Sequence, residues 1–190
     1  MSETLEPNQE QEPKREMTSQ AVLDLYKELE KRGIQIWVDG GWGVDALLEE
    51  QTRPHKDLDI AIEEQNLVVF RELLKSKGYQ EVRPEEGRPW NFVLGDGQGH
   101  EIDVHVVVLD DKSNGIYGPK ENGEMYPASS LTGMGKIEGQ IVKCISPEDM
   151  VKFHNQGYKI KESDIHDVTL LCKKFDISLP EEYAKLVNQE

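Results

Sequence analysis

Residues 37–62, WVDGGWGVDALLEEQTRPHKDLDIAI, contain the pattern that decides the fold. A strand over IQIWV (34–38) leads into a turn, GGW (40–42), which a short helix follows over GVDALLEE (43–50). DLDIAI (57–62) then alternates polar and apolar residues as a second strand. Glycine-rich turns before helices bind phosphate groups, and paired aspartates on a strand bind hard cations. The stretch therefore indicates either a nucleotide site built around metal or a turn beside a solvated strand.

Asp57 and Asp59 are the strongest candidates for metal ligands. Residues i and i+2 of a strand point to the same face about 6.6 to 7 Å apart, so two carboxylates there can converge on one or two hard cations. Leu58, Ile60 and Ile62 form the opposite, apolar row. This apolar row favours a buried strand with a functional polar face over a solvated edge strand.

Asp103 is the candidate third carboxylate. It lies in HEIDVHVVVL (100–109), a strand that follows WNFVLG (90–95) through the hairpin turn DGQG. Three carboxylates on neighbouring strands predict a site for two metal ions, which would bind a triphosphate and neutralise its leaving group. Asp103 is also a candidate general base for an incoming hydroxyl. His105 shares its face and either lines an acceptor pocket or is a structural histidine.

The glycine turn is the candidate phosphate-binding half of the site. Gly40 and Gly41 let the backbone come close to phosphate oxygens, and the start of the following helix favours anions. Gly41, Gly43 and Ala46 also spell G-x-G-x-x-A, the pattern of a dinucleotide-binding turn. We reject that alternative because the chain passes through one βαβ unit and then continues into hairpins.

Basic side chains on two segments are further candidates for phosphate contacts. Arg53 and His55 precede the acidic strand in TRPHKD, together with Lys56. Lys161, like Lys159, comes just before a later helix. Cationic groups on loops beside a glycine turn can bind nucleotide phosphates, although a generic surface loop is the alternative for each.

Composition limits the class of protein. The 190 residues carry 22 Lys and Arg against 37 Asp and Glu, a formal net charge of −15, which disfavours a nucleic-acid partner. The same charge either attracts cationic small molecules or serves solubility. Without an apolar run of ~18 residues, a membrane span is not expected. Cys144 and Cys172 lie in different segments, which suits reduced core thiols in a cytoplasmic protein.

The remaining pattern predicts an α+β protein, a mixed β-sheet flanked by helices. Residues 1–17 are expected to be a disordered tail, and residues 18–190 a single domain with C-terminal helices. The first helix is predicted to begin with Thr18 or Ser19 as its cap, and a later one to begin at Pro147 with Ser146 as its cap. GKIEGQIVKC (135–144) predicts a second, smaller hairpin.

The order G-G-W-x-x-D-A, T-R-x-H-x-D-x-D and I-D-V-H resembles the small antibiotic nucleotidyltransferases. These are the aminoglycoside 2″-adenylyltransferase and lincosamide nucleotidyltransferase group of the DNA polymerase β-like superfamily. The similarity spans residues 34–175. It implies the nucleotidyltransferase fold, Mg²⁺ bound by Asp57, Asp59 and Asp103, and nucleotide phosphates held at Gly40 and Gly41. Many members have Gly-Ser where this chain has Gly41 and Trp42, so backbone amides must replace the hydroxyl.

The sequence thus predicts a Mg²⁺-dependent transfer of AMP from ATP to a hydroxyl of a small molecule, with release of pyrophosphate. The expected acceptor is an aminoglycoside or lincosamide-like antibiotic, since an acidic protein attracts a cationic one. Two alternatives stay open: a protein acceptor, and a nucleotide-binding module without turnover. Retention of all three aspartates argues against the second alternative.

Overall fold

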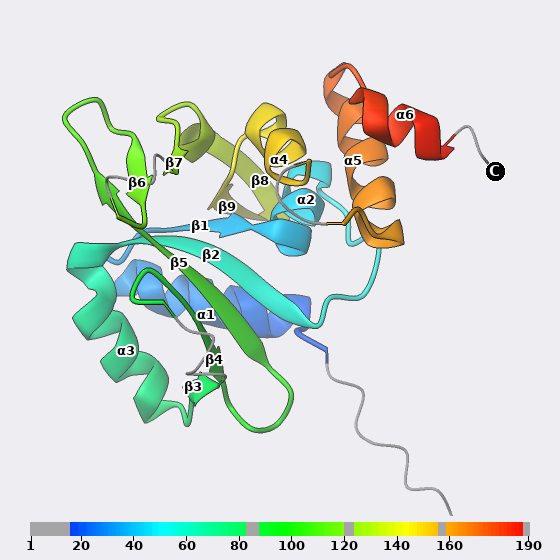
Figure 1. The fold of residues 1–190 in the computed structure, drawn as a ribbon. Helices are drawn as coiled ribbons and strands as arrows, with labels where there is room; N and C mark the ends of the chain where they lie inside the picture. Colours follow the sequence, from blue (N-terminus) through cyan, green and yellow to red (C-terminus); the bar gives the residue numbers. More distant parts are fainter. Residues whose placement is uncertain (1–15, 83–87, 120–123, 156–158, 188–190) are drawn as a thin grey trace, which may run out of the picture.

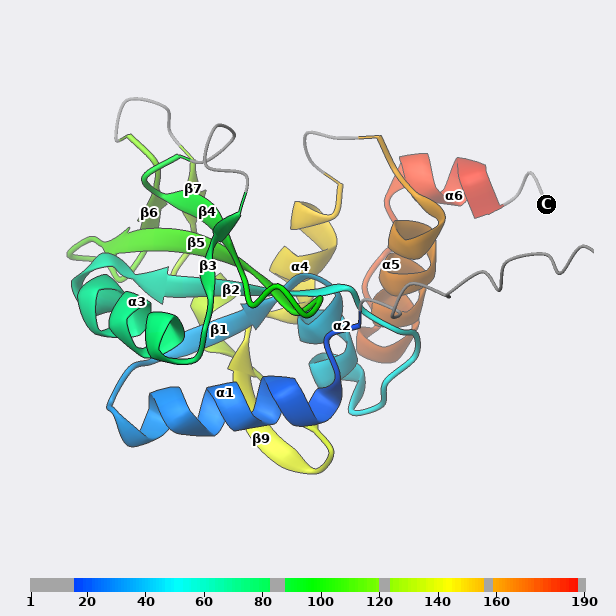
Figure 2. The ribbon, with the colours of Figure 1, turned by 90° about the horizontal axis from the view of Figure 1, so that it is seen from below.

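The computed structural model describes residues 16–82, 88–119, 124–155 and 159–187. Within them, one mixed sheet is flanked by helices, which confirms the predicted α+β class. Figures 1 and 2 show α1 and α3 along the sheet, with α5 and α6 toward the end at which β1 meets α2. The helices are α1 (Ser19–Lys31), α2 (Gly40–Leu48), α3 (Leu67–Ser76), α4 (Pro147–Phe153), α5 (Glu162–Phe175) and α6 (Glu181–Val187). The strands are β1 (Ile36–Asp39), β2 (Asp57–Glu63), β3 (Gln80–Val82), β4 (Asn91–Gly95), β5 (Glu101–Leu109), β6 (Gly115–Tyr117), β7 (Met125–Tyr126), β8 (Gly133–Ile137) and β9 (Gln140–Cys144).

The strand order brings three aspartates side by side. Seven strands run in the order β3-β4-β5-β2-β1-β9-β8, while β6 pairs with β5 and β7 with β6. Strands β1 and β2 are antiparallel with Asp39 opposite Asp59, and β2 and β5 are parallel with Asp59 beside Asp103. Carboxylates at one level of three adjacent strands therefore meet on one face of the sheet.

The expected βαβ unit is wrong, because β1 and β2 are antiparallel. Helix α2 begins where β1 ends and packs against β8, so the chain returns alongside β1 instead of crossing over the sheet. Strand β2 is instead parallel to β5, from which α3 and the strands β3 and β4 separate it in sequence, and β1 is parallel to β9. The hairpins predicted for β4 with β5 and for β8 with β9 are confirmed.

The expected turn at GGW is also wrong, because α2 already begins at Gly40. Asp39 has an extended backbone and its side chain accepts a hydrogen bond of 2.8 Å from the Gly40 N–H. An aspartate in this position caps a helix by satisfying one of its free amides. The helix therefore begins directly at the end of β1.

Capping agrees with expectation at α1 and differs from it at α4. The Thr18 side chain accepts a hydrogen bond from the Ala21 N–H at 3.2 Å, which confirms it as the cap of α1. Helix α4 begins at Pro147 as predicted, but the Ser146 hydroxyl donates to the Asp149 carboxylate at 3.1 Å. Ser146 therefore precedes the helix without capping it through a hydrogen bond to its backbone.

The core continues to the start of the described chain. Met17 is buried and its N–H donates to the His55 carbonyl at 2.8 Å. Residues 1–15 of the expected tail lie outside the described residues. Cys144 and Cys172 are buried and free, as predicted. Among the described helices, none has the length and apolar character required to cross a membrane.

Candidate active site

A cleft of about 1330 Å³ opens where β1 meets α2. Its walls come from the strands that carry Asp39, Asp59 and Asp103, here called the acidic row, from the first turn of α2, and from the facing parts of α4 and α5. Most of the predicted site residues line it: Gly40, Gly41, Arg53, His55, Asp57, Asp59 and Lys161. Asp103 adjoins the same cleft through its contacts with Asn91 and His105.

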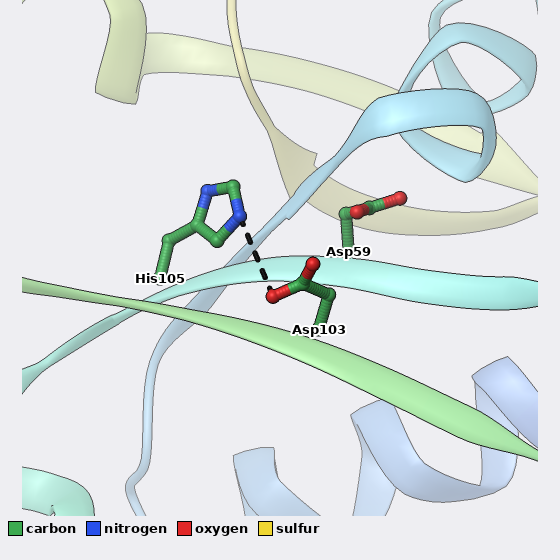
Figure 3. Close-up of side chains that lie close together, drawn as sticks. All are labelled: Asp59, Asp103 and His105. Atoms are coloured by element: carbon green, nitrogen blue, oxygen red, sulfur yellow. Dashed lines mark ion pairs between the residues drawn. The ribbon is translucent and has the colours of Figure 1, made fainter. Parts of the chain in front are cut away.

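Asp59 lies at the centre of the acidic row. Burial raises its pKa well above the usual range, and the charges of Asp57, Asp103 and Asp39 raise it further. Oxygen and nitrogen atoms of Asp59, Asp103 and His105 lie within 4.8 Å of one another, close enough to hold one metal ion. Figure 3 shows these three side chains on the same side of strands β2 and β5. A cation bound there would offset the repulsion between the carboxylates.

Asp57 sits at the edge of this group. It is exposed at the start of β2, lines the cleft and is paired in register with Glu101. The structure thus brings Asp59 and Asp103 together with His105, whereas Asp57 is not among the three residues whose ligand atoms converge. Its metal contact stays a prediction, and an exposed carboxylate two residues from Asp59 can turn toward a bound cation.

His105 belongs to a chain of hydrogen bonds that ends at Asp39. The Tyr126 hydroxyl donates to Asp39 Oδ2 at 3.0 Å and lies 2.6 Å from His105 Nδ1. Burial and the neighbouring Asp39 raise the pKa of Tyr126 well above its ordinary value, so its hydroxyl keeps its proton. On the far side of the ring, His105 Nε2 is 3.6 Å from Asp103 Oδ1, and Asp103 accepts a 2.7 Å hydrogen bond from the Asn91 amide.

The two glycines of α2 make room for side chains of the site. Gly40 has φ +52°, and a Cβ there would lie 2.1 Å from Asp59 Oδ2. A Cβ on Gly41 would lie 2.4 Å from His55 Nδ1 and 2.7 Å from an Arg53 Nη. Glycine at both positions therefore lets these three groups sit against the first turn of the helix. Phosphate binding by the glycines stays a prediction.

His55 is held in place by Asp45 and Trp42. It is only 3% exposed, its Nε2 lies 2.5 Å from Asp45 Oδ2, and its ring packs on Trp42 with 4.7 Å between centroids. Because a carboxylate only accepts hydrogen bonds, this pair puts a proton on Nε2. The other ring nitrogen, His55 Nδ1, lies beside Gly41, and His55 lines the cleft.

Arg53 is anchored to α5. Its guanidinium pairs with both carboxylate oxygens of Asp167, with Nε at 2.9 Å from Oδ1, and this contact raises the pKa of Arg53. Asp167 itself is 1% exposed. Lys161 precedes α5, and its backbone N–H donates to Asp164 at 2.7 Å. The Arg53–Asp167 pair thereby ties the loop before β2 to the helix on the other side of the cleft.

Asp167→Asn is expected to lower the free energy of unfolding by about 2 kcal/mol, because it leaves a half-buried guanidinium without its counter-charge. Chemical denaturation measures the change. Glu28→Gln is the matched control, since it removes the carboxylate of the exposed Arg32–Glu28 pair in α1 and should have a much smaller effect. Equal effects of the two substitutions would show that the Arg53–Asp167 pair stabilises the fold no more than an exposed ion pair does.

Several residues of the site were not found from the sequence. Asp39 had a detectable signal, because it stands directly before Gly40 in a position that caps helices. Asn91, Tyr126 and Asp167 had none, since they come from segments that only tertiary contacts bring to the cleft.

Comparison with known proteins gives a consistent result. A family model described as aminoglycoside-2''-adenylyltransferase matches residues 21–171. A lincosamide resistance protein of Staphylococcus haemolyticus is 29% identical over 148 residues, which are 77% of this chain and 88% of the relative. The crystal structure of the lincosamide antibiotic adenylyltransferase LnuA with lincomycin bound is 26% identical, covers 86% of this chain and 99% of its own, and has a TM-score of 0.72. The structure of ANT(2'')-Ia in complex with adenylyl-2''-tobramycin is 18% identical with a TM-score of 0.64, over 83% of this chain and 88% of its own, and shares the fold.

Proposed function

Because the chain belongs to the aminoglycoside-2''-adenylyltransferase family, we propose that it transfers AMP from ATP to a hydroxyl of a small antibiotic-like molecule and releases pyrophosphate. That the chain is a nucleotidyltransferase enzyme, as its motifs predicted, follows from the family itself. The observation that carries the proposal is the convergence of Asp59 and Asp103 at one end of the cleft, beside the first turn of α2. The proposal includes the cytoplasmic location that Cys144 and Cys172 predict.

The acidic row is suited to Mg²⁺, which prefers carboxylate oxygens. We assign Asp59, Asp103 and, after rotation of its side chain, Asp57 as the residues that would hold it. When bound, Mg²⁺ would supply positive charge to the triphosphate and its leaving group. The raised pKa of Asp59 supports this fit, because burial and then the neighbouring carboxylates disfavour its charge, and a bound cation would offset both effects.

The chain's own residues would do the remaining work. The first turn of α2, with Gly40 and Gly41, would receive the phosphates, and Arg53 and His55 beside Gly41 would contact them. Lys161 would approach from the other wall of the cleft. Asp103 would accept the proton of the attacking hydroxyl, and the Asn91 amide would keep its carboxylate in place.

The lining of the cleft favours a lincosamide-like acceptor over a polycationic one. Among the described residues, five carboxylates and four Lys or Arg side chains line it, so in this part of the chain the acidic charge of the protein is not concentrated at the cleft. Aromatic rings line the cleft next to His105: Tyr117 lies 5.4 Å from the imidazole, and Phe153 packs on Tyr126 at 5.1 Å, measured between centroids. Such a surface binds apolar and sugar-like faces with few charges. The lining residues with charge are Asp39, Asp57, Asp59, Glu124, Asp164, Arg53, Lys56, Arg88 and Lys161.

The test is pyrophosphate release from ATP and Mg²⁺ across a panel of lincosamides and aminoglycosides. We expect release that depends on the acceptor, is fastest with a lincosamide such as lincomycin, and is lost in Asp57→Asn and Asp103→Asn. Release with tobramycin but not lincomycin would move the acceptor to the aminoglycosides. ATP binding without release for any acceptor would contradict the proposed reaction and favour a protein acceptor.

A further inference from the structure

Asp45 lies in α2 and contacts the loop that precedes β2. It is 2% exposed. Asp45 Oδ1 accepts hydrogen bonds from the Thr52 N–H at 3.1 Å and from the Thr52 hydroxyl at 2.8 Å. Asp45 Oδ2 lies 2.5 Å from His55 Nε2. One buried carboxylate therefore contacts both ends of residues 52–55, which contain Arg53.

The His55 ring lies between two residues of α2 that are one helical turn apart. Gly41 and Asp45 are four positions apart and therefore share one face of the helix. A Cβ on Gly41 would lie 2.4 Å from His55 Nδ1, while Asp45 contacts the other ring nitrogen. The His55 carbonyl also accepts a hydrogen bond from the Met17 N–H at 2.8 Å. These contacts fix the position of the loop relative to the first turn of α2.

Arg53, between these two contacts, lies beside the first turn of α2. A Cβ on Gly41 would lie 2.7 Å from an Arg53 Nη, and Arg53 lines the cleft with 27% of its side chain exposed. A guanidinium has five N–H donors, and the pair with Asp167 uses two of them. Arg53 can therefore keep its pair with Asp167 while it contacts a phosphate.

We propose that Asp45 is a positioning residue for the nucleotide, which keeps Arg53 and the first turn of α2 in one phosphate-binding surface. The inference rests on the proposed function and deepens it, since it gives a role to the aspartate of G-G-W-x-x-D-A. Groups that are already in place bind a ligand more tightly, because they lose less conformational entropy on binding. Asp45 would act in this way through residues 52–55.

Charge alone predicts the opposite effect of Asp45. A carboxylate close to a bound triphosphate repels it, so removing Asp45 would strengthen ATP binding. A positioning role predicts weaker binding instead, because residues 52–55 lose the contacts that hold them on α2. The sign of the change in ATP affinity therefore separates the two effects.

The test measures steady-state kinetics and calorimetric binding of ATP with Mg²⁺ for Asp45→Ala and Asp45→Asn. For Asp45→Ala we expect the KM for ATP to rise by at least ~10-fold, the scale of one or two lost hydrogen bonds, with the KM for lincomycin unchanged. The kcat should change less than the KM for ATP, because the lost contacts hold the nucleotide in the ground state and the transition state alike. Asp45→Asn should lose less, since an amide oxygen can still accept from Thr52.

Asp149 in α4 provides the matched control. It is 3% exposed and, like Asp45, accepts several hydrogen bonds, which come from the side chains of Ser129, Ser146 and Lys152. Asp149 is not among the described residues that line the cleft. Asp149→Ala and Asp149→Asn should therefore destabilise the fold as the Asp45 variants do, yet keep the wild-type KM for ATP. An equal rise in both pairs of variants would overturn the inference.

Arg53→Gln shows whether Asp45 acts through the loop. In the wild type this substitution should raise the KM for ATP, because it removes the cation beside the first turn of α2. In the Asp45→Ala background it should add little, since Arg53 is already displaced. Penalties that simply multiply would mean that Asp45 acts independently of Arg53, which would overturn the inference.

ATP binding by Asp45→Ala that is as tight as in the wild type, or tighter, would also overturn the inference. A wild type that binds no ATP would contradict the proposed function instead. Hydrogen exchange of the Thr52 amide would then still decide whether Asp45 holds the loop. Exchange should become faster in Asp45→Ala and stay at the wild-type rate in Asp149→Ala. An unchanged rate in Asp45→Ala would overturn the inference by itself.

Discussion

Asp59→Asn is expected to reduce kcat/KM for pyrophosphate release by ~1000-fold, the scale found when a charge-stabilising group is removed from an active site. Asp59 lies between Asp39 and Asp103 in the register of the sheet. A cation shared by these carboxylates would therefore lie next to Asp59. The amide keeps the size of the carboxylate and removes its charge. Acceptor-dependent pyrophosphate release measures the effect.

Asp111→Asn provides the matched control for that experiment, because it makes the same chemical change on an exposed residue after β5. It should leave the rate unchanged. A similar rate for Asp59→Asn and the wild type would refute the assignment of Asp59 as a metal ligand.

Asp59→Asn should also make the metal-free protein more stable near neutral pH. Burial and the neighbouring carboxylates raise the pKa of Asp59 in the folded state above its ordinary value, so the folded protein binds this proton more tightly than the unfolded chain. The contribution of Asp59 to the stability of the wild type is therefore greatest below the unfolded pKa of about 4, and it is lost as pH rises through the folded pKa. Asp59→Asn lacks this loss. Urea denaturation at several pH values should show its advantage disappearing in acid.

The pattern of the sequence predicted most of the elements and two of the hairpins, but not how β1 and β2 pair. Period-two alternation over DLDIAI and HEIDVHVVVL was sufficient to predict both acidic strands. It could not show that β1 and β2 run antiparallel, since a strand, a helix and a second strand in order also describe a parallel crossover. The two paths differ in the tertiary contacts of α2, which packs against β8 as well as β1 and β2.

The site was predictable where its residues share a strand or a turn. Asp57 and Asp59 were paired correctly on one face, yet which of them lies closest to Asp103 depends on the register between β2 and β5. Register is set by contacts along whole strands, which a local pattern does not contain. For the same reason Tyr126, which comes from the two-residue strand β7, could not be connected with His105 in advance.

Gly40→Ala is expected to reduce kcat by ~100-fold, because a displacement of about 1 Å in a reacting group is sufficient for a loss of this size. The new Cβ would lie 2.1 Å from Asp59 Oδ2 and 2.7 Å from its Cγ, so the carboxylate must leave its place in the acidic row. Since Gly40 has φ +52°, alanine there also carries backbone strain of about 1 kcal/mol. Steady-state kinetics and chemical denaturation measure the two effects separately.

Gly33→Ala separates backbone strain from displacement of Asp59. Gly33, just after α1, has φ +73°, and a Cβ there would meet nothing within 4 Å. This variant should lose a similar amount of stability from strain and keep its full kcat. If Gly40→Ala loses no more activity than Gly33→Ala, Asp59 can shift without consequence. If only Gly40→Ala loses activity, the close approach of Asp59 to α2 is needed for the reaction, and glycine at position 40 serves the carboxylate as well as the phosphates proposed to bind beside it.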